Sequence, residues 1–360
     1  MDLLSNLKAL CEASGIAGFE GGVKAVVRSQ WEPLVDELRQ DALGNLIGIR
    51  RGRRPEGQPA RSILLAGHCD EVGLVVSGME RGFLRIMTVG GVDPRVLPGQ
   101  EVTVHGRQPL AGVIGLRPPH VVPAAERKKP APLNELWVDV GLDQEQAQAL
   151  IDLGDPITLH APATALLSER LAAKALDDRA GVAVLSVCLE HLQSMRHTWD
   201  VYAVATTQEE LGMRGAMVSA FGLMPDIAIA VDVTFGEQPG VSEEESFKMD
   251  GGPTIAIGPN VHPAMHAGLV ETAKALEIPY QIEPLPASSG TDGWAIQVTR
   301  EGIPTAVVSI PLQNMHTAVE VAALSDIRRA GRLLAAFISG LDETFMQKLT
   351  DAFKAPAGKR

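Results

Sequence analysis

Short, continuous runs of apolar residues recur along the chain, and each is followed by a segment with helical periodicity. The runs are SILLAG, VYAVAT, DIAIAV and TAVVSI, at residues 62–67, 201–206, 226–231 and 305–310. Strands that are apolar on both faces are typical of a sheet that helices cover on both sides. The helical segments are expected at residues 180–192, 214–221, 267–276 and 325–341. This pattern predicts an α/β fold built in layers.

A second pattern occupies residues 77–163. Strand-like pieces (FLRIMTVGG, EVTVHG, LAGVIGL, LWVDVG and PITLHA) alternate there with Gly, Pro and Asp, and a short helical signal covers residues 144–153. Many short strands at regular spacing indicate a small β-barrel or sandwich. The proline-rich, charged stretch at 118–132 is expected to be an exposed loop of this insert. We therefore predict an α/β domain from residues 1–76 and 164–345, a β-rich insert at 77–163 and a polar tail at 346–360.

Composition narrows the class of protein. The 360 residues are 45% hydrophobic and 21% charged, which is typical of a globular protein. The net charge of −12 argues against nucleic acid or an anionic membrane as the main partner. Apolar runs stay well short of the ~20 residues that span a bilayer. The three cysteines (Cys11, Cys69 and Cys188) are widely spaced and form no disulfide framework, so a cytoplasmic location without a membrane partner is expected.

Acidic residues and histidines stand where the apolar runs end. They are His68, Asp70, Glu209, Glu210, Asp232 and His316, and the pair Asp177–Asp178 precedes the helix expected from residue 180. In an open α/β sheet, ligands bind beyond the carboxyl ends of the strands. The sequence therefore predicts that these side chains meet at one edge of the sheet.

Such a cluster suits metal-dependent hydrolysis. Carboxylates packed together raise one another's pKa, so a positive charge is needed to keep them ionised. Two imidazoles with several carboxylates suit zinc, cobalt or manganese, and two ions bridged by a carboxylate would activate water and polarise a carbonyl. Of the adjacent pair Glu209 and Glu210, one can bind metal while the other acts as general base. Asp70 can steady the imidazole of His68 through its carboxylate or through the local backbone.

The segments around these residues resemble the M42 metallo-aminopeptidases, also called tetrahedral or glutamyl-aminopeptidase-like peptidases. The matching segments are DALGNLIG at 41–48, GHCDEVG at 67–73, KALDDRAG at 174–181, TTQEELGMRGA at 206–216, the strand with Asp232, SSGTDG at 288–293 and NMHTAVE at 314–320. Each motif is modest evidence by itself, but their order and spacing along nearly the whole chain are highly specific.

The resemblance implies a fold and a division of roles. The fold would be a zinc-peptidase-like three-layer α/β sandwich with a mixed central sheet, interrupted by a small barrel-like insert. Asp177 would bridge two divalent ions (Zn, Co or Mn). His68 and Asp232 would complete one metal site, and Glu210 and His316 the other. Glu209 would be the general base, and Asp70 would orient His68. Members of the family assemble as dimers and as hollow tetrahedra of twelve subunits.

We therefore expect a cytosolic aminopeptidase that releases N-terminal residues from short peptides with a free N-terminus. Two alternatives remain open: an endoglucanase-type glycoside hydrolase, a label that some relatives carry, and a non-catalytic scaffold with a peptidase fold. Outside the metal cluster, Asp178 is expected to cap a helix or to pair with Arg179. The sequence leaves open the preferred residue, the metal, the choice between dimer and dodecamer, and the role of the acidic triplet Glu243–Glu245.

Overall fold

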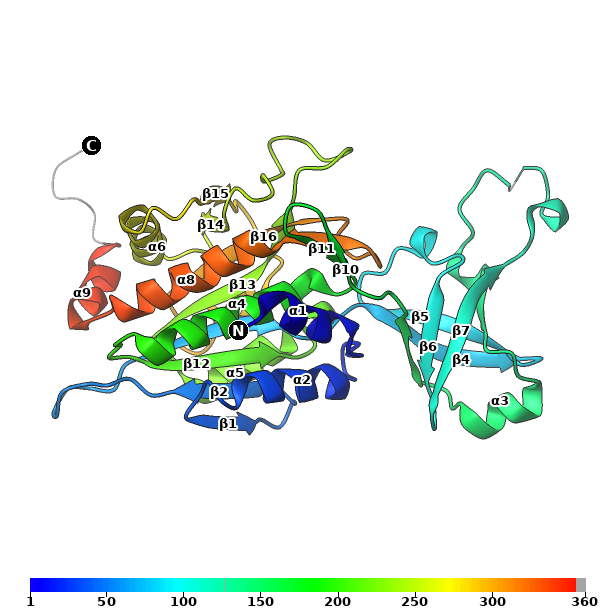
Figure 1. Cartoon of the computed structure of the whole chain (residues 1–360), viewed down its shortest axis with the longest axis horizontal. Coiled ribbons are helices and arrows are strands. Elements are labelled where there is room, and N and C mark those ends of the chain that lie inside the picture. The colour runs from blue at the N-terminus through cyan, green and yellow to red at the C-terminus, as the bar shows by residue number, and fades with distance from the viewer. Residues whose placement is uncertain (126, 354–360) are drawn as a thin grey trace.

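The computed structural model describes residues 1–125 and 127–353, and these form an α/β body and a separate β-barrel beside it (Figure 1). The body strands are β1 (Glu37–Gln40), β2 (Leu46–Arg50), β3 (Ser62–His68), β10 (Thr164–Leu166), β11 (Arg170–Ala173), β12 (Asp200–Thr206), β13 (Ile227–Phe235), β14 (Thr254–Ile257), β15 (Gln281–Pro284), β16 (Thr305–Gln313) and β17 (Glu320–Ala323). The body helices are α1 (Leu3–Glu12), α2 (Gly21–Trp31), α4 (Leu176–Ser194), α5 (Arg214–Leu223), α6 (Pro263–Ala275), α7 (Asp292–Ile296), α8 (Leu324–Ser339) and α9 (Glu343–Asp351).

The body strands form one mixed sheet, in the order β1-β2-β12-β3-β13-β16-β17-β11-β10, with β14 and β15 attached beside β16. The four predicted apolar runs are the strands β12, β3, β13 and β16, and each is parallel to its neighbour in this group. Within the described residues the helices form layers around this sheet, which confirms the predicted three-layer fold (Figure 1).

Strand β3 shows why these runs are apolar throughout. Ile63 and Leu65 are buried in the large core that contains α4 and α8, whereas Leu64 and Ala66 are buried in a second core with α5 and α7. Successive side chains of a strand point to opposite faces of the sheet, so a strand that is covered on both faces is apolar along most of its length.

The insert is a closed barrel of six strands in the order β4-β5-β8-β7-β6-β9. Its elements are β4 (Gly73–Glu80), β5 (Phe83–Val89), β6 (Glu101–His105), β7 (Pro109–Leu116), β8 (Leu136–Asp139), α3 (Gln144–Leu150) and β9 (Pro156–Leu159). Alternate residues, such as Leu74 and Val76 or Val102 and Val104, fill the barrel core. Of the two arrangements predicted for the insert, a barrel or a sandwich, the barrel is therefore correct. The domain limits at residues 77 and 163 stay a prediction.

The predicted polar tail begins inside a helix. Helix α9 reaches Asp351, and its Phe345 and Leu349 are buried against the main core. Residues 354–360 of the predicted tail lie outside the described residues.

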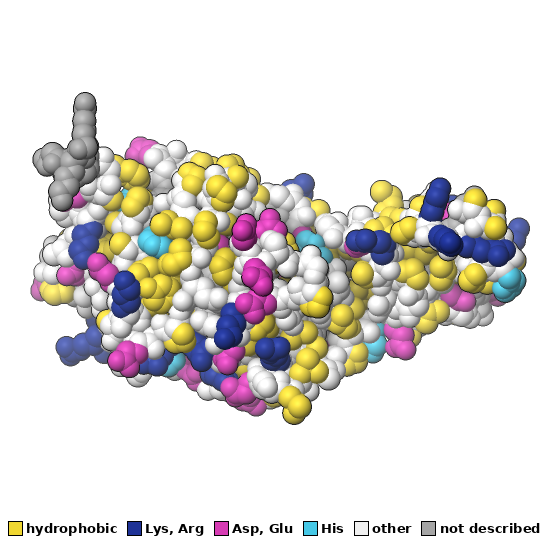
Figure 2. Space-filling view, turned by 90° about the horizontal axis from the view of Figure 1, so that it is seen from above, with side chains coloured by type: hydrophobic (Ala, Val, Ile, Leu, Met, Phe, Trp, Pro, Cys, Tyr) yellow, Lys and Arg dark blue, Asp and Glu magenta, His cyan; other side chains and the backbone are white. Residues whose placement is uncertain are grey.

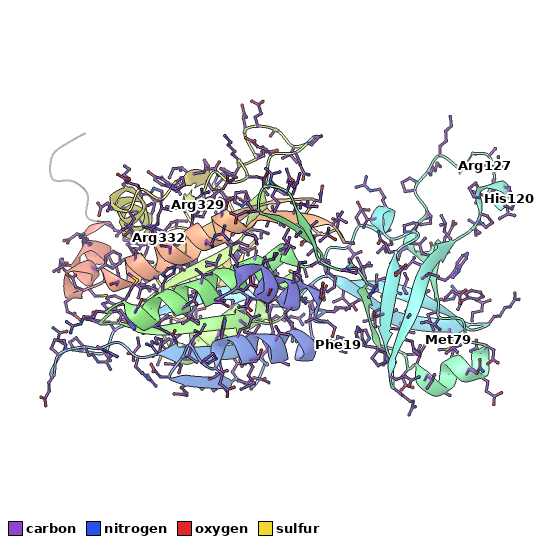
Figure 3. All side chains as sticks on the ribbon, viewed as in Figure 1. Phe19, Met79, His120, Arg127, Arg329 and Arg332 are labelled. Atoms are coloured by element: carbon purple, nitrogen blue, oxygen red, sulfur yellow. The ribbon has the colours of Figure 1, made fainter. Side chains whose placement is uncertain are left out.

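The outer end of the barrel is exposed and basic. His120 and Arg127 lie on its outermost loop, which agrees with the exposed loop predicted at 118–132 (Figure 3). Lysine and arginine side chains gather at this end in the space-filling view (Figure 2). Among the described residues, none of the helices has the length and apolar character needed to cross a membrane.

A buried ionic cluster joins the N-terminal segment to the body. The Glu71 carboxylate lies 2.7 Å from Lys174 Nζ and 2.9 Å from Arg179 Nη2, and all three side chains are buried. Arg179 Nη1 also donates hydrogen bonds to the carbonyls of Leu10 and Ala13. Burial alone would raise the pKa of Glu71, but the two cations hold it below its usual value.

We expect Glu71→Gln to lower the free energy of unfolding by about 3–5 kcal/mol, because it leaves two buried cations without their anion. Urea unfolding measures this change. The matched control is Glu80→Gln, which removes an exposed pair with Arg85 on the barrel and should have little effect because water screens it. Equal effects of the two substitutions would contradict a stabilising role for the cluster.

Candidate active site

The carboxyl ends of the parallel strands bring the predicted site residues together. Strand β3 ends at His68, which lies opposite Thr206 at the end of β12, and Asp232 lies near the end of β13. The chain leaves β12 through the short helix η4 (Glu209–Leu211). A cleft of about 620 Å³ is lined by His68, Asp177, Glu209, Glu210, Asp232 and His316. Asp70 lies behind this cleft, in contact with His68 and η4.

Sharp backbone turns position these side chains. Ala175, Gln208, Asn314 and His316 have φ values of 57°, 55°, 57° and 60°, a region that residues other than glycine rarely adopt. Such conformations cost about 1–3 kcal/mol each and concentrate at functional sites. Asp177 precedes the regular part of α4, and its own backbone is non-helical.

Asp177 lies between the two imidazoles of the site. Its Oδ1 lies 3.1 Å from His68 Nε2, and its Oδ2 lies 3.1 Å from His316 Nε2. His316 Nε2 also lies 3.3 Å from Glu210 Oε1. One carboxylate thus faces two imidazoles, each of which has a further acidic neighbour.

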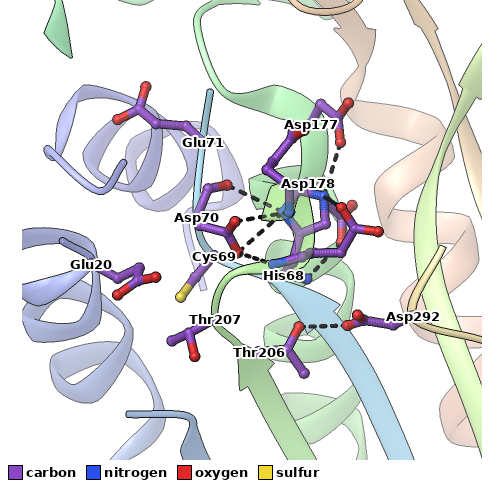
Figure 4. Close-up of polar contacts among 12 residues, drawn as sticks. Glu20, His68, Cys69, Asp70, Glu71, Asp177, Asp178, Thr206, Thr207 and Asp292 are labelled. Carbon is purple, nitrogen blue, oxygen red and sulfur yellow. Dashed lines mark hydrogen bonds and ion pairs between the residues drawn. The ribbon is translucent and has the colours of Figure 1, made fainter. Parts of the chain in front are cut away.

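Asp70 holds its neighbours mainly through backbone contacts. His68 Nδ1 lies 3.2 Å from the carbonyl oxygen of Asp70, so the backbone steadies the imidazole (Figure 4). The Asp70 carboxylate instead accepts hydrogen bonds from the N–H groups of Glu209 and Glu210, at 3.0 and 3.1 Å. Burial raises the pKa of Asp70 to about 7.

Asp178 also lies among the site residues, although the sequence indicated that it would cap a helix or pair with Arg179. Its Oδ1 accepts from the N–H of Gly181, which is the predicted capping contact, and its Oδ2 accepts from the N–H of His68. Ligand atoms of His68, Asp178 and Asp232 lie within 4.8 Å of one another, as do those of His68, Asp177 and Glu210. Arg179 pairs with Glu71 rather than with Asp178.

Glu320 is a second residue that the sequence reasoning missed. Its buried carboxylate accepts from the N–H of Asp177 at 3.0 Å and from the N–H of His316 at 2.7 Å. Its place at the end of the NMHTAVE segment, four residues after His316, was the only sequence signal for it.

The site holds more buried negative charge than nearby cations neutralise. Burial raises the pKa of Glu209 to about 9, and the charges of Asp232 and Asp292 act in the same direction. Burial, together with Asp178, also raises the pKa of Asp232 well above its usual value. Asp292 accepts from Thr206 Oγ1 through Oδ2 (Figure 4), but its buried Oδ1 has no hydrogen-bond partner among the described residues.

The negative charge of the neighbouring carboxylates raises the pKa of both histidines. Burial lowers the pKa of His68, but the hydrogen bond to Asp177 and the charges of Glu209 and Asp70 outweigh it and raise the pKa well above the usual value. The contacts of His316 with Asp177 and Glu210 raise its pKa to about 11. The excess of negative charge and the donor set of carboxylates and imidazoles fit a divalent cation of the zinc, cobalt or manganese kind.

Comparison with known proteins identifies the family. The model of the M42 glutamyl aminopeptidase family matches residues 44–333, and the chain belongs to this family. The lysyl aminopeptidase of Pyrococcus furiosus is 35% identical over 343 residues, which are 93% of this chain and 96% of that protein. Members of the family hydrolyse peptide bonds, so the chain is a peptidase.

Solved structures confirm the fold. The aminopeptidase APDkam598 from Desulfurococcus kamchatkensis superposes with a TM-score of 0.89 at 36% identity, covering 99% of each chain. The TET1 peptidase of Pyrococcus horikoshii, which can assemble into a tetrahedron or a large octahedral shell, has a TM-score of 0.82 at 28% identity. That similarity covers 94% of this chain and 100% of the other.

Glu320→Gln tests whether this carboxylate holds the site in shape. Gln keeps one acceptor but turns an amide NH₂ toward the N–H of Asp177 or His316, so both backbones should shift. We expect zinc affinity to fall by about 10- to 100-fold, measured by calorimetric titration of the metal-free protein. The exposed Glu301→Gln is the matched control, and wild-type zinc affinity in Glu320→Gln would show that Glu320 does not position the site.

Proposed function

We propose that this chain is an aminopeptidase that binds two divalent metal ions and releases N-terminal residues from short peptides. The observation that carries the proposal is the Asp177 carboxylate, with one oxygen 3.1 Å from each of two imidazoles. Asp177 would bind both ions. His68 and Asp232 would complete one site, and Glu210 and His316 the other. Asp70 would orient His68, supported by the contact of its carbonyl with the imidazole.

Glu209 is proposed as the general base. Its carboxylate lines the cleft, and its Oε2 lies 3.9 Å from His68 Nε2, beside the proposed metal ligands. When bound, the ions would supply a lower pKa for the attacking water and polarisation of the peptide carbonyl. Glu209 accepts a proton from the water and returns it to the leaving amine, so it is unchanged after each turnover.

The charge of the cleft favours a chain end as substrate. The free amino group of a peptide is a cation at neutral pH, and the anionic cluster would attract it. A glycoside hydrolase would use two carboxyl groups on either side of a sugar and would need neither imidazole. A non-catalytic scaffold has no need of a complete set of ligands with a base, and every predicted position is filled here.

Assembly and location complete the proposal. We propose a homo-oligomer between a dimer and a dodecamer, because a similar peptidase, TET1, assembles into closed shells. The separate barrel with its exposed outer end provides a surface for such contacts. The three cysteines are free and buried, which suits the reducing cytoplasm.

Glu209→Gln tests the role of the base. Removing a general base typically slows turnover by about 100- to 10,000-fold, and we expect a loss of this size in a chromogenic aminopeptidase assay. Metal content, measured in the same sample, should stay at the wild-type level. Near-wild-type turnover with metal retained would refute the assigned role, and Glu301→Gln controls for the loss of one exposed charge.

Metal removal tests the cofactor through two readouts, activity and thermal stability. Chelation followed by dialysis should abolish hydrolysis and lower the melting temperature, because the buried carboxylates lose their counter-charge. Returning zinc, cobalt or manganese at one hundred times its Kd should restore about 2.7 kcal/mol of stability. An unchanged melting temperature and full activity after chelation would argue for a metal-independent enzyme.

A further inference from the structure

The cleft that contains the catalytic centre extends to a second acidic region. Glu244, Glu245 and Glu283 line it together with the catalytic residues, and its described wall contains no lysine or arginine. Phe235, Phe247, Pro284 and Leu285 provide apolar surface in the same cleft. The view from above shows acidic side chains near the middle of the molecule, on the surface of the body (Figure 2).

Glu283 is the most informative of these acids, because it is held rigidly and lacks a counter-charge. Its side chain is only 8% exposed. Thr234 Oγ1 donates to its Oε1 and Thr254 Oγ1 donates to its Oε2, both at 2.6 Å. Within the described residues the carboxylate forms no ion pair. A buried anion without a cation is costly, and each of its oxygens can accept another hydrogen bond.

The position of Glu283 relates it to the catalytic centre. Its partner Thr234 follows Asp232 by two residues on β13, so the two side chains point to the same face of the strand. Two residues of a strand span roughly 7 Å. A substrate side chain that starts near Asp232 and ends near Glu283 therefore needs a long stem, and lysine has a flexible stem of four carbons.

We propose that the enzyme selects peptides whose first residue is lysine or arginine, with Glu283 as the specificity-determining residue. This inference rests on the proposed aminopeptidase function. The apolar walls accommodate the methylene stem, and the fixed carboxylate binds the cationic end. Glu244 and Glu245 add negative charge at the exposed rim, which gives these two members of the acidic triplet a role. An acidic first residue would meet like charge in the same cleft and be rejected.

The test compares kcat/KM for lysyl, arginyl, leucyl and glutamyl aminomethylcoumarin substrates. The wild-type enzyme should prefer the lysyl and arginyl substrates over the leucyl one by at least about tenfold, with glutamyl the poorest. Glu283→Gln keeps the shape but removes the charge, so it should lower kcat/KM for the two basic substrates by at least about tenfold. Its kcat/KM for the leucyl substrate should fall by a much smaller factor, so that the ratio of lysyl to leucyl kcat/KM drops, because the leucyl side chain needs no charge in the cleft.

Two further variants complete the design. Glu243→Gln removes the same charge from the same loop but does not line the cleft, so its substrate ranking should match the wild type. Glu244→Gln with Glu245→Gln changes only exposed side chains, which keeps the test valid if Glu283→Gln does not fold. This double variant should lower the ratio of lysyl to leucyl rates.

The outcomes separate the two proposals. Hydrolysis of the leucyl or glutamyl substrate in preference to the basic ones would overturn the specificity proposal and leave the aminopeptidase function standing. An equal loss of kcat/KM on all substrates in Glu283→Gln would overturn it as well. If Glu283→Gln does not fold, an unchanged ratio of lysyl to leucyl rates in the double variant would overturn it. Failure to hydrolyse any N-terminal residue in the presence of metal would instead refute the proposed function.

Discussion

Buried negative charge at the carboxyl edge of the sheet is the constraint on which the rest of this structure depends. Asp177, Asp178, Asp232 and Glu209 lie close together, and burial keeps water from screening them. Two imidazoles cannot neutralise so many carboxylates, so the folded cluster must either take up protons, as the raised pKa values of Glu209 and Asp232 indicate, or gain a cation. Metal binding would therefore also contribute to folding stability, because the cations that enable hydrolysis relieve the repulsion.

Carboxylates also organise the frame around this charge. Asp70 accepts from two consecutive N–H groups of η4, and Glu320 joins the backbones of Asp177 and His316. Hydrogen bonds to a carboxylate are stronger than those between neutral groups, so they can hold the strained turns after β12 and β16. The acids of the site thus fall into those that face the cleft and those that hold the backbone.

The sequence predicted the part of the site that follows from local pattern. Apolar runs located β3, β12, β13 and β16, and parallel pairing explained why the residues after them converge. Asp178, Glu320 and Glu283 depend on contacts between distant segments, and their surroundings have no periodic signature. Glu283 lies on a strand of four residues and meets Thr234 from 49 positions away, so only the folded chain shows that its carboxylate is buried. The short strands of the barrel were recognisable from their regular spacing in the sequence. The closure of the barrel depends on the pairing of β4 with β9, which no local pattern encodes.

The same electrostatic principle acts at two places in one cleft, with different consequences. At the proposed metal site many carboxylates surround a small space, which favours dense charge such as a divalent ion. At Glu283 one carboxylate lies among apolar side chains and hydroxyl groups, which offers too few ligands to hold a metal ion but suits a single ammonium or guanidinium group. Because the strand β13 carries both Asp232 and Thr234, the spacing between the two regions is set by a rigid element rather than by a loop. A peptide can then be recognised by the distance between two positive charges, its amino terminus and its first side chain.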